Sequence, residues 1–444
     1  MALGGGTFLS INKVLPGSYI NFISAKKASG ILSDRGIAAM ALFLDWGVSD
    51  EIFEVSAEDF EKKSLQIFGY NYTHPKMRGL RDLFKNVKTL YAFRLNSGGE
   101  YAENAYAVAK YKGNRGNALK VVIKKNAAYT DTNMYDVELL FDGIKIYSET
   151  ASSIAELSEN NYVSWKREAV AVLTAGEPLT GGKNDENIGG DYLSAQHAKF
   201  LEKAESYSFN AIGCPYDDIG INGIYADFAK RLRDDVGVKF QAVCFNIPAD
   251  HEGVVNVVSE ISSPDESFGR SALIYWITGI IAGCAVNRSN LNRKYDGDFV
   301  INIDYSQSKL VEAIKNGQFM LHNVNGERKV LADINSLVTV TAEKGDNFKE
   351  NQTVRVIDQI ANDVALMFNE RYLGIVPNND SGRASLWSDI VTHHQTLSKL
   401  GAISDFLPED IKVEQGETKR SVIVSDVIMP MNAMAQLYMT CIVE

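Results

Sequence analysis

Cysteine, histidine and proline are scarce in this sequence of 444 residues, which contains 4 Cys, 6 His and 9 Pro. The cysteines are far apart and form no C-x-x-C pair, which argues against a disulfide framework and against a zinc site. We therefore predict reduced, buried thiols at Cys214, Cys244, Cys284 and Cys441. Few prolines and a hydrophobic content of 45% exclude a broadly disordered chain and predict two to four globular domains.

The sequence also lacks an excess of basic residues, since 45 Lys and Arg stand against 56 Asp and Glu. The formal net charge of -11 leaves little attraction for phosphates, so nucleic acid is not an expected partner. Charged residues such as Arg233, Asp234 and Asp235 fall opposite an apolar helix face that includes Phe228 and Leu232. This pattern predicts solvated side chains on the outer side of that helix.

The hydrophobic pattern predicts neither a signal peptide nor a membrane span. The N-terminus, MALGGGTFLS, has no cationic region followed by an apolar core. The most apolar run, 272–286, has 15 residues, fewer than the roughly 20 that cross a bilayer. Gly279 and Gly283 have the spacing of membrane helix dimers, but in a soluble helix they predict close packing on a sheet. We expect a protein of the cytoplasm without membrane insertion.

Residues 89 to about 165 consist of short alternating runs separated by turn signals. The runs LYAFRL, AYAVAKY, LKVVIKK and YDVELLF alternate apolar and polar residues, and Asp142-Gly143 is a turn dipeptide. This region is predicted to be a small antiparallel β domain.

After the Gly-rich loop at 179–190, the hydrophobic period changes to that of alternating helices and strands. Helices are predicted at 191–207, 221–236 and 271–286, and strands at 209–214, 239–247 and 299–303. Such an alternation implies a parallel sheet covered on both faces. Ser306 can cap a short helix, and Asn325-Gly326 predicts a hairpin, so this domain should end near residue 335.

Both ends of the chain are apolar and strand-like. The last quarter contains predicted helices at 353–373 and 382–400 and strand-like runs at 421–429 and 436–443. The N-terminal region combines GGG at 4–6 with a strand-like piece at 16–23, which predicts an extended arm. Terminal strands of this kind pair either with another chain or within their own.

Asp217, His251 and Ser271 support the best enzyme hypothesis, because they occur in the order of a subtilase triad. Asp217 and Asp218 follow one predicted strand, His251 follows the next, and Ser271 begins the apolar helix. However, Ser271 lacks the G-T-S turn of such a nucleophile, and His251 lies in an acidic loop. Turn, solvated and helix-capping roles are therefore favoured, and no catalytic residue is expected.

Metal and cofactor sites lack their usual motifs. His393 and His394 are adjacent, so on a helix they would point about 100 degrees apart. This favours a surface or core histidine pair over metal ligation. GGKN at 181–184 has no phosphate-loop frame, and no dinucleotide fingerprint follows a strand. We expect neither a metal nor a cofactor.

Five segments of the sequence resemble the tail sheath family of contractile phages and phage-tail-like bacteriocins. They are PGSYINF at 16–22, LTGGKNDENIGGDYL at 179–193, AGCAVNRSNLNRKYDG at 282–297, VIDQIANDVALMFNERYLG at 356–374 and MAQLYMTCIVE at 434–444. The resemblance implies a multidomain α+β and α/β fold. Its parts would be an N-terminal arm, a small antiparallel β-sandwich domain, a subtilisin-like α/β domain without protease function and a C-terminal α+β domain with exchanged terminal strands.

Pattern and resemblance together predict five regions. They are an extended arm at 1–33, a linking α/β segment at 34–88, a β-sandwich domain at 89–175, a subtilisin-like domain at 176–335 and a C-terminal sheath domain at 336–444, which ends in a strand arm at 436–444. The resemblance implies that the exchanged strands consist of Tyr19, Ile20, Asn21, Phe22, Ile23, Leu437, Tyr438, Met439, Thr440, Cys441, Ile442 and Val443.

The resemblance further implies a structural, non-enzymatic function. Six subunits would form a ring around an inner tail tube, rings would stack helically, and contraction would drive the tube through a target cell envelope. The implied partners are further copies of the chain, the tube protein, and baseplate and tail terminator proteins. Assembly would take place in the host bacterial cytoplasm, and the product would be the tail of a released virion or bacteriocin particle.

Two alternatives from other functional classes stay open. One is a subtilase-like serine hydrolase that uses Asp217, His251 and Ser271. The other is a monomeric carbohydrate- or protein-binding module that uses the β domain and pairs both terminal strands within its own chain.

Overall fold

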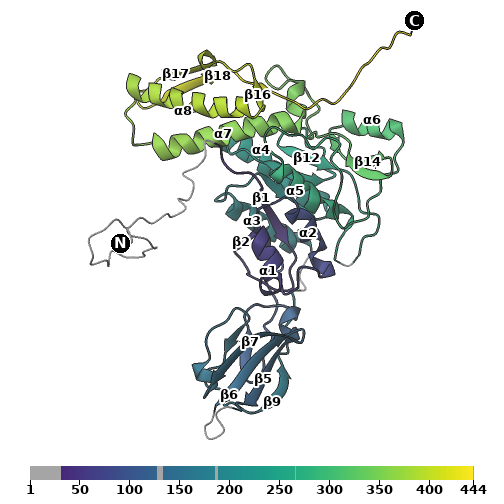
Figure 1. The fold of residues 1–444 in the computed structure, drawn as a ribbon, viewed down its shortest axis with the longest axis vertical. Helices are drawn as coiled ribbons and strands as arrows, with labels where there is room; N and C mark the ends of the chain where they lie inside the picture. Colours follow the sequence, from purple (N-terminus) through teal and green to yellow (C-terminus); the bar gives the residue numbers. More distant parts are fainter. Residues whose placement is uncertain (1–31, 128–133, 186–188, 266, 444) are drawn as a thin grey trace, which may run out of the picture. The chain divides into compact units, whose positions relative to one another are not determined.

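The computed structural model describes residues 32–127, 134–185, 189–265 and 267–443 (Figure 1). These residues form two compact units. The main unit comprises Arg35–Asn362 and the residues from Pro430 onward, and the C-terminal unit comprises Asp363–Met429 and the described residues up to Asp34. Residues 32–34 therefore belong to the C-terminal unit, and the C-terminal tail belongs to the main unit.

A seven-stranded sheet forms the centre of the main unit, with strand order β13-β12-β11-β10-β1-β3-β2. Its strands are β1 (Ile37–Leu42), β2 (Ile52–Ser56), β3 (Thr89–Arg94), β10 (Ala211–Gly213), β11 (Gln241–Phe245), β12 (Val254–Val257) and β13 (Gln318–Phe319). Every neighbouring pair is parallel except β2 and β3. The parallel pairing confirms the prediction for the region after residue 190.

Helices cover both faces of this sheet. Each strand contributes side chains to the core on both faces, because its successive side chains point to opposite faces. In β1, Met40 packs into one hydrophobic cluster and Ala39 into the other. The first cluster contains side chains of α1 (Ala57–Phe68), α2 (Arg78–Phe84) and α5 (Ile274–Gly283), and the second contains side chains of α3 (Gly190–Ala204) and α4 (Ile219–Arg231).

Two local predictions in the main unit are confirmed. Ser306 caps α6 (Gln307–Lys315), and its hydroxyl accepts a hydrogen bond from the Lys309 N–H. Asn325 and Gly326 both have positive φ angles and join β14 (Leu321–Val324) to β15 (Glu327–Val330) in an antiparallel hairpin.

The β domain contains a four-stranded antiparallel sheet, in the order β7-β6-β5-β9, and the two-stranded pair β4-β8 (Figure 1). The strands are β4 (Ala107–Ala109), β5 (Leu119–Lys125), β6 (Tyr135–Phe141), β7 (Ile144–Ala151), β8 (Val163–Trp165) and β9 (Thr174–Pro178). Asp142 and Gly143, both with positive φ, turn β6 into β7 as predicted. One apolar core, which includes Leu139, Phe141 and Trp165, joins the two sheets.

The C-terminal unit is built on two long helices and a hairpin. Helix α7 (Asn351–Arg371) enters it from the main unit, and α8 (Asp380–Lys399) precedes β17 (Ile411–Gln415) and β18 (Val422–Asp426). Leu386 and Ile390 of α8 pack with Ile411 in its core. The two-residue strands β16 (Ile403–Ser404) and β19 (Met429–Pro430) complete the order. Both predicted helices are therefore present.

The structure corrects the strand predictions at three places. The run 89–95, predicted with the β domain, supplies β3 of the large sheet, where it pairs with β1. The strand Val254–Val257 was missed because it is only four residues long and includes Asn256. Residues 299–303 form no strand, and only Ile301 makes a bridge, because β13 occupies the edge beside β12.

The predictions for the cysteines are confirmed at three of the four positions. Cys214, Cys244 and Cys284 are buried, as expected, but Cys441 is exposed, because it lies on the unpaired C-terminal tail. Across the described residues, none of the helices is both long and apolar enough to cross a membrane.

Gly283 provides a test of the packing around the apolar helix α5. A Cβ atom there would lie 1.9 Å from the backbone oxygen of Asn86, so Gly283→Ala must shift the backbone. We expect a loss of about 2 kcal/mol or more in the free energy of unfolding, measured by chemical denaturation. Gly223→Ala in α4 is the matched control, because nothing lies within 4 Å of its new Cβ atom. Equal effects of the two substitutions would contradict the close packing.

Candidate functional site

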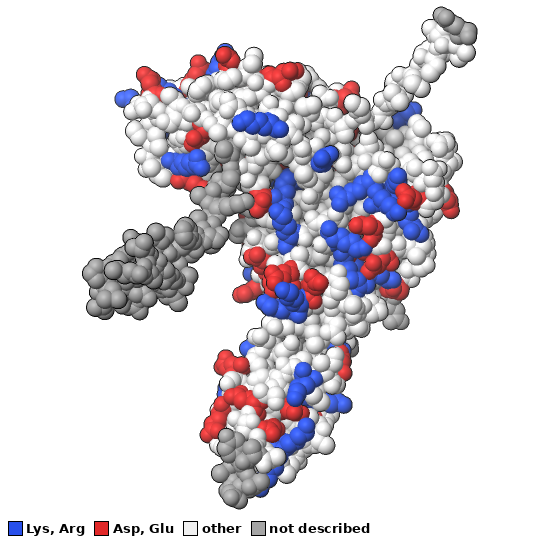
Figure 2. Space-filling view, in the orientation of Figure 1, with Lys and Arg blue, Asp and Glu red and all other residues white. Residues whose placement is uncertain are grey.

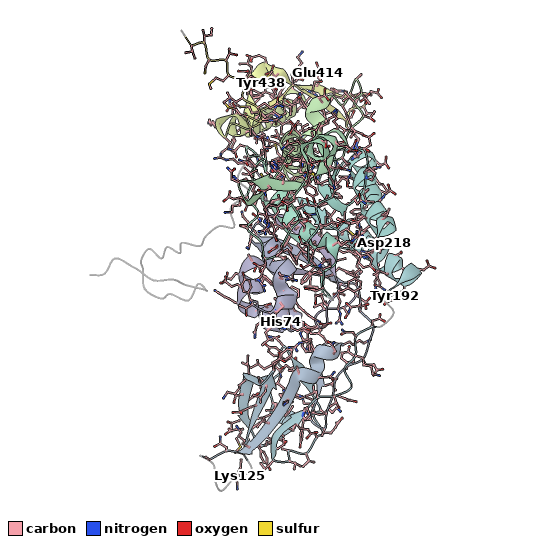
Figure 3. All side chains as sticks on the ribbon, turned by 90° about the vertical axis from the view of Figure 1, so that its right-hand side faces the viewer. His74, Lys125, Tyr192, Asp218, Glu414 and Tyr438 are labelled. Atoms are coloured by element: carbon pink, nitrogen blue, oxygen red, sulfur yellow. The ribbon has the colours of Figure 1, made fainter. Side chains whose placement is uncertain are left out.

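The C-terminal tail exposes a run of apolar side chains. Residues 431–443 form no helix or strand in the described chain and are drawn as an extended trace (Figures 1 and 3). Leu437 is 86%, Tyr438 87%, Ile442 87% and Val443 93% exposed. Figure 2 shows no charged side chain on this segment. So much apolar surface in water is unfavourable and marks a surface that another element covers.

The root of the tail is held at a defined place on α7. The side-chain amide of Gln352 donates a hydrogen bond to Met431 O at 2.9 Å and accepts one from Ala433 N, also at 2.9 Å. The hydroxyl of Thr353 lies 3.2 Å from Asn432 Oδ1. Because Gln352 is only 4% exposed, these contacts fix where the tail leaves the main unit.

The hairpin β17–β18 in the C-terminal unit has two open edges. Each of its strands pairs only with the other within the described residues. Ile423 is 50% and Val424 39% exposed, and Val427, directly after β18, is 69% exposed. An isolated two-stranded sheet is at most marginally stable and can accept a further strand at either edge.

Sequence reasoning identified the tail but missed its anchor and the hairpin's open edges. The strand-like run 421–429 predicted β18, whereas the unpaired state of its outer edge follows only from the strand order. The N-terminal candidates Tyr19, Ile20, Asn21, Phe22 and Ile23 lie outside the described residues. Their predicted role is therefore unchanged.

Ser271 and Asp217 lie together at the carboxyl edge of the parallel sheet. Both line a cleft of about 780 Å³. The Ser271 hydroxyl donates to Pro215 O at 2.8 Å, and the Asp217 carboxylate pairs with Arg270, whose Nε lies 2.9 Å from it. The two residues therefore make structural contacts with other groups.

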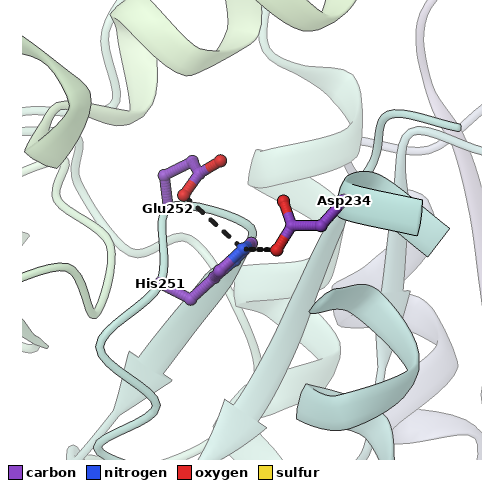
Figure 4. A group of neighbouring side chains, drawn as sticks. All are labelled: Asp234, His251 and Glu252. Carbon is purple, nitrogen blue, oxygen red and sulfur yellow. Dashed lines mark hydrogen bonds and ion pairs between the residues drawn. The ribbon is translucent and has the colours of Figure 1, made fainter. Parts of the chain in front are cut away.

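His251 lies at the opposite edge of the sheet. Its carbonyl accepts the N–H of Val254, the first residue of β12, so it precedes that strand, whereas Pro215 follows β10. Its Nε2 lies 3.0 Å from Asp234 and 3.6 Å from Glu252 (Figure 4). The structure thus separates His251 from Ser271 and Asp217, and the proposed triad is not assembled.

The cluster of Asp234, His251 and Glu252 is an ion-pair network. Gly253 N–H donates to His251 Nδ1 at 2.9 Å, which leaves the ring hydrogen on Nε2, the atom a metal would need. The Lys344 ammonium already lies 2.9 Å from Glu252. Burial raises the pKa of Glu252, but Lys344 and the neighbouring positive charges outweigh it, so the net pKa is lowered. Burial lowers the pKa of His251.

Arg233, beside this cluster, differs from the prediction made from the sequence. It was predicted to be solvated, but its guanidinium is 3% exposed and makes two hydrogen bonds to Asp358 of α7, at 2.7 and 2.8 Å. Asp234 and Asp235 are exposed as predicted, so only Arg233 turns inward, toward Asp358 of α7. A bidentate pair of this kind fixes the helix in one orientation.

His197 on α3 lines the same cleft as Ser271 and is 0% exposed. Its Nδ1 lies 2.8 Å from the hydroxyl of Tyr225, and its Nε2 has no hydrogen-bond partner among the described residues. Burial lowers the pKa of His197 to about 4. The ring is therefore neutral at neutral pH, and protonating it within the fold is unfavourable.

Models of four sheath domains match consecutive parts of the chain. They are the tail sheath protein Gp18 domain III N-terminal region at residues 35–95, the phage tail sheath protein beta-sandwich domain at 88–185, the phage tail sheath protein central domain at 189–336 and the phage tail sheath C-terminal domain at 343–444. The matches extend over nearly all of the chain after residue 34.

Whole proteins with this arrangement are similar over nearly their full length. The phage-like element PBSX protein XkdK of Bacillus subtilis is 29% identical over 98% of this chain and 99% of its own. The crystal structure of the sheath tail protein of Desulfitobacterium hafniense has a TM-score of 0.78 and 31% identity, over 94% of this chain and 98% of its own. The contracted helical sheath of the anti-feeding prophage, at 12% identity and a TM-score of 0.54 over 96% and 99% of the two chains, shares the fold.

The cleft histidine predicts a loss of stability in acid. The pKa of His197 is about 4 in the folded chain and 6.5 ordinarily, so the unfolded chain binds the proton first as the pH falls. The free energy of unfolding should begin to fall below about pH 6.5. The decrease should be nearly complete around pH 4 and should amount to about 3 kcal/mol. His197→Gln lacks the titrating ring, so its urea midpoint should vary less over this window. Equal pH dependence in variant and wild type would exclude this role.

Proposed function

The chain belongs to the phage tail sheath family, and on this basis we propose that it polymerises into stacked six-fold rings around an inner tail tube. Contraction of this lattice would drive the tube through a target cell envelope. The observation that carries the proposal is the exposed, uncharged C-terminal tail on a rigid root. A chain that functions alone has no physical reason to keep such a segment in water.

The proposed link between subunits is exchange of terminal strands. Residues 437–443 alternate so that Leu437, Met439 and Val443 point to one side, and Tyr438 and Ile442 point to the other. A strand that is apolar on both sides suits a position within a sheet, buried on both faces. We propose that it adds to the β17–β18 hairpin of a neighbouring copy, together with the N-terminal strand at 19–23.

The proposed domain roles follow the predicted boundaries. Residues 1–33 and 436–444 would be the linking arms. The part of 89–175 that follows β3 would be the β-sandwich domain, and 176–335, with the segment 34–88 and β3, a subtilisin-like domain without protease function. The separation of His251 from Ser271 supports the last of these roles. The main and C-terminal units would move as rigid bodies during contraction while the exchanged strands stay paired.

We further propose the setting in which the sheath acts. The chain would assemble in the host bacterial cytoplasm on the tube protein, between baseplate and tail terminator proteins. It would leave the cell as part of a virion or bacteriocin tail. The extended lattice would be metastable, so contraction would need no nucleotide and no cofactor.

Ile442→Asp tests strand exchange at one position. Because Ile442 is 87% exposed, the charge should leave the unfolding midpoint unchanged but should abolish polymerisation by placing an ion inside the neighbour's sheet. Sedimentation and negative-stain electron microscopy measure assembly. Met434→Asp is the control, since Met434 is 99% exposed on the same tail but lies outside the proposed strand. Normal tubes from Ile442→Asp would refute exchange of this strand.

The class of assembly is tested with the full-length chain. Concentrated protein, alone or mixed with its tube protein, should give rings or tubes with six-fold symmetry in electron micrographs. Deletion of residues 19–23 should leave a folded protein that forms none of them. Persistent monomers in the presence of the tube would count against the sheath assembly as a whole.

A further inference from the structure

Two adjacent histidines connect both segments of the C-terminal unit that the exchange proposal involves. His393 and His394 lie on α8 and are 0% exposed. His393 Nε2 lies 2.9 Å from the Asp363 carboxylate of α7, and His394 Nε2 lies 2.9 Å from the Asp426 carboxylate of β18. The pair, predicted only as a surface or core pair, is thus held between two carboxylates on two other elements.

The hydrogen positions in this cluster follow from its geometry. His394 Nδ1 lies 2.9 Å from Ile390 O, which can only accept, so this nitrogen carries a hydrogen. His393 Nδ1 lies 3.4 Å from the same nitrogen and must present its lone pair to it. The hydrogen of His393 is therefore on Nε2, where it donates to Asp363. The orientation of one ring dictates the tautomer of the other.

A hydrogen is also required between His394 Nε2 and Asp426, because two lone pairs cannot face each other at 2.9 Å. Both rings therefore donate outward, His394 to Asp426 of β18 and His393 to Asp363 of α7. Replacing Asp426 removes one of the two contacts that hold the His394 ring, and the contact with Ile390 O remains.

Ser33 completes the cluster at the root of the N-terminal segment. The Asp363 oxygen that does not face His393 accepts the Ser33 backbone N–H at 3.2 Å and also the Ser33 hydroxyl. Asp363 is 5% exposed, whereas Ser33 lies at the surface. One buried carboxylate therefore holds the N-terminal root with one oxygen and the histidine pair with the other.

We propose that Ser33, Asp363, His393, His394 and Asp426 form a relay that couples anchoring of the N-terminal segment to the position of the β17–β18 hairpin. The regulatory meaning rests on the proposed function, in which the N-terminal strand and the hairpin both pair with neighbours. A pull on the N-terminal segment would loosen Asp363, free the tautomer of His393 and weaken the hold of His394 on Asp426. These five are positioning residues, and none acts on a substrate.

Native-state hydrogen exchange on the full-length, unassembled chain tests the relay in both directions. Ser33→Ala should speed exchange of the hairpin amides, Ile411–Gln415 and Val422–Asp426, by about tenfold. Asp426→Asn should speed exchange of the Ser33 amide by a similar factor, because coupling between two sites is reciprocal. Ser33 is exposed and Asp426 partly so, so neither variant is expected to unfold the unit.

Glu414→Gln is the matched control, because it removes a carboxylate from the same hairpin outside the relay (Figure 3). It should leave exchange of the Ser33 amide within about twofold of wild type. An unchanged hairpin in Ser33→Ala, or an equal effect of Glu414→Gln and Asp426→Asn on Ser33, would overturn the relay. Failure of strand exchange would appear in the assembly assays and leave these rates unaffected.

Selective 15N labelling of the 6 histidines gives an independent readout. His393 should show the Nε2–H tautomer in wild type, and Asp426→Asn should shift the 15N signals of His393, a side chain that it does not contact, because the His394 ring beside it is less firmly held. A pure Nδ1–H tautomer at His393 in wild type would contradict the deduced direction of hydrogen bonding.

Discussion

Strand β1 is the element on which the main unit depends, because it joins strands that precede the β domain in the chain to strands that follow it. Its partners are β3, which follows α1 and α2, and β10, which follows the whole β domain. The sheet therefore cannot close until the chain has returned from the β domain. Burial of β1 on both faces explains why its sequence, IAAMAL, is uniformly apolar.

Buried ion pairs hold the part of α7 before residue 363, and with it the root of the tail, within the main unit. Arg233 of the main unit forms a hydrogen-bonded ion pair with Asp358. Arg355, which is fully buried, pairs with Asp333 and donates a hydrogen bond to Arg288 O. Such pairs add little net stability but penalise every alternative placement, since each would leave a charge buried and unpaired. Gln352, about one helical turn before Arg355 in α7, is thereby held where it can anchor the tail.

A rigid root and an unpaired end are compatible requirements. An apolar strand left in water would pair at random with other exposed edges, which makes it an aggregation hazard. Its short length and its fixed point of departure restrict the partners it can reach. The same logic applies to the hairpin. The contact between His394 and Asp426 holds its position, while its outer edges pair with no other strand among the described residues.

Local patterns in the sequence determined most of the helices, the caps and turns at Ser306, Asn325-Gly326 and Asp142-Gly143, and the apolar strand-like C-terminus. They did so because each depends on residues within one or two turns of chain. Only the tertiary structure decided that 89–94 joins the large sheet, that Arg233 is buried, that His251 and Ser271 lie at opposite edges, and that His393 and His394 lie between two carboxylates. These outcomes depend on pairing partners that are tens to hundreds of residues away, which no local period encodes.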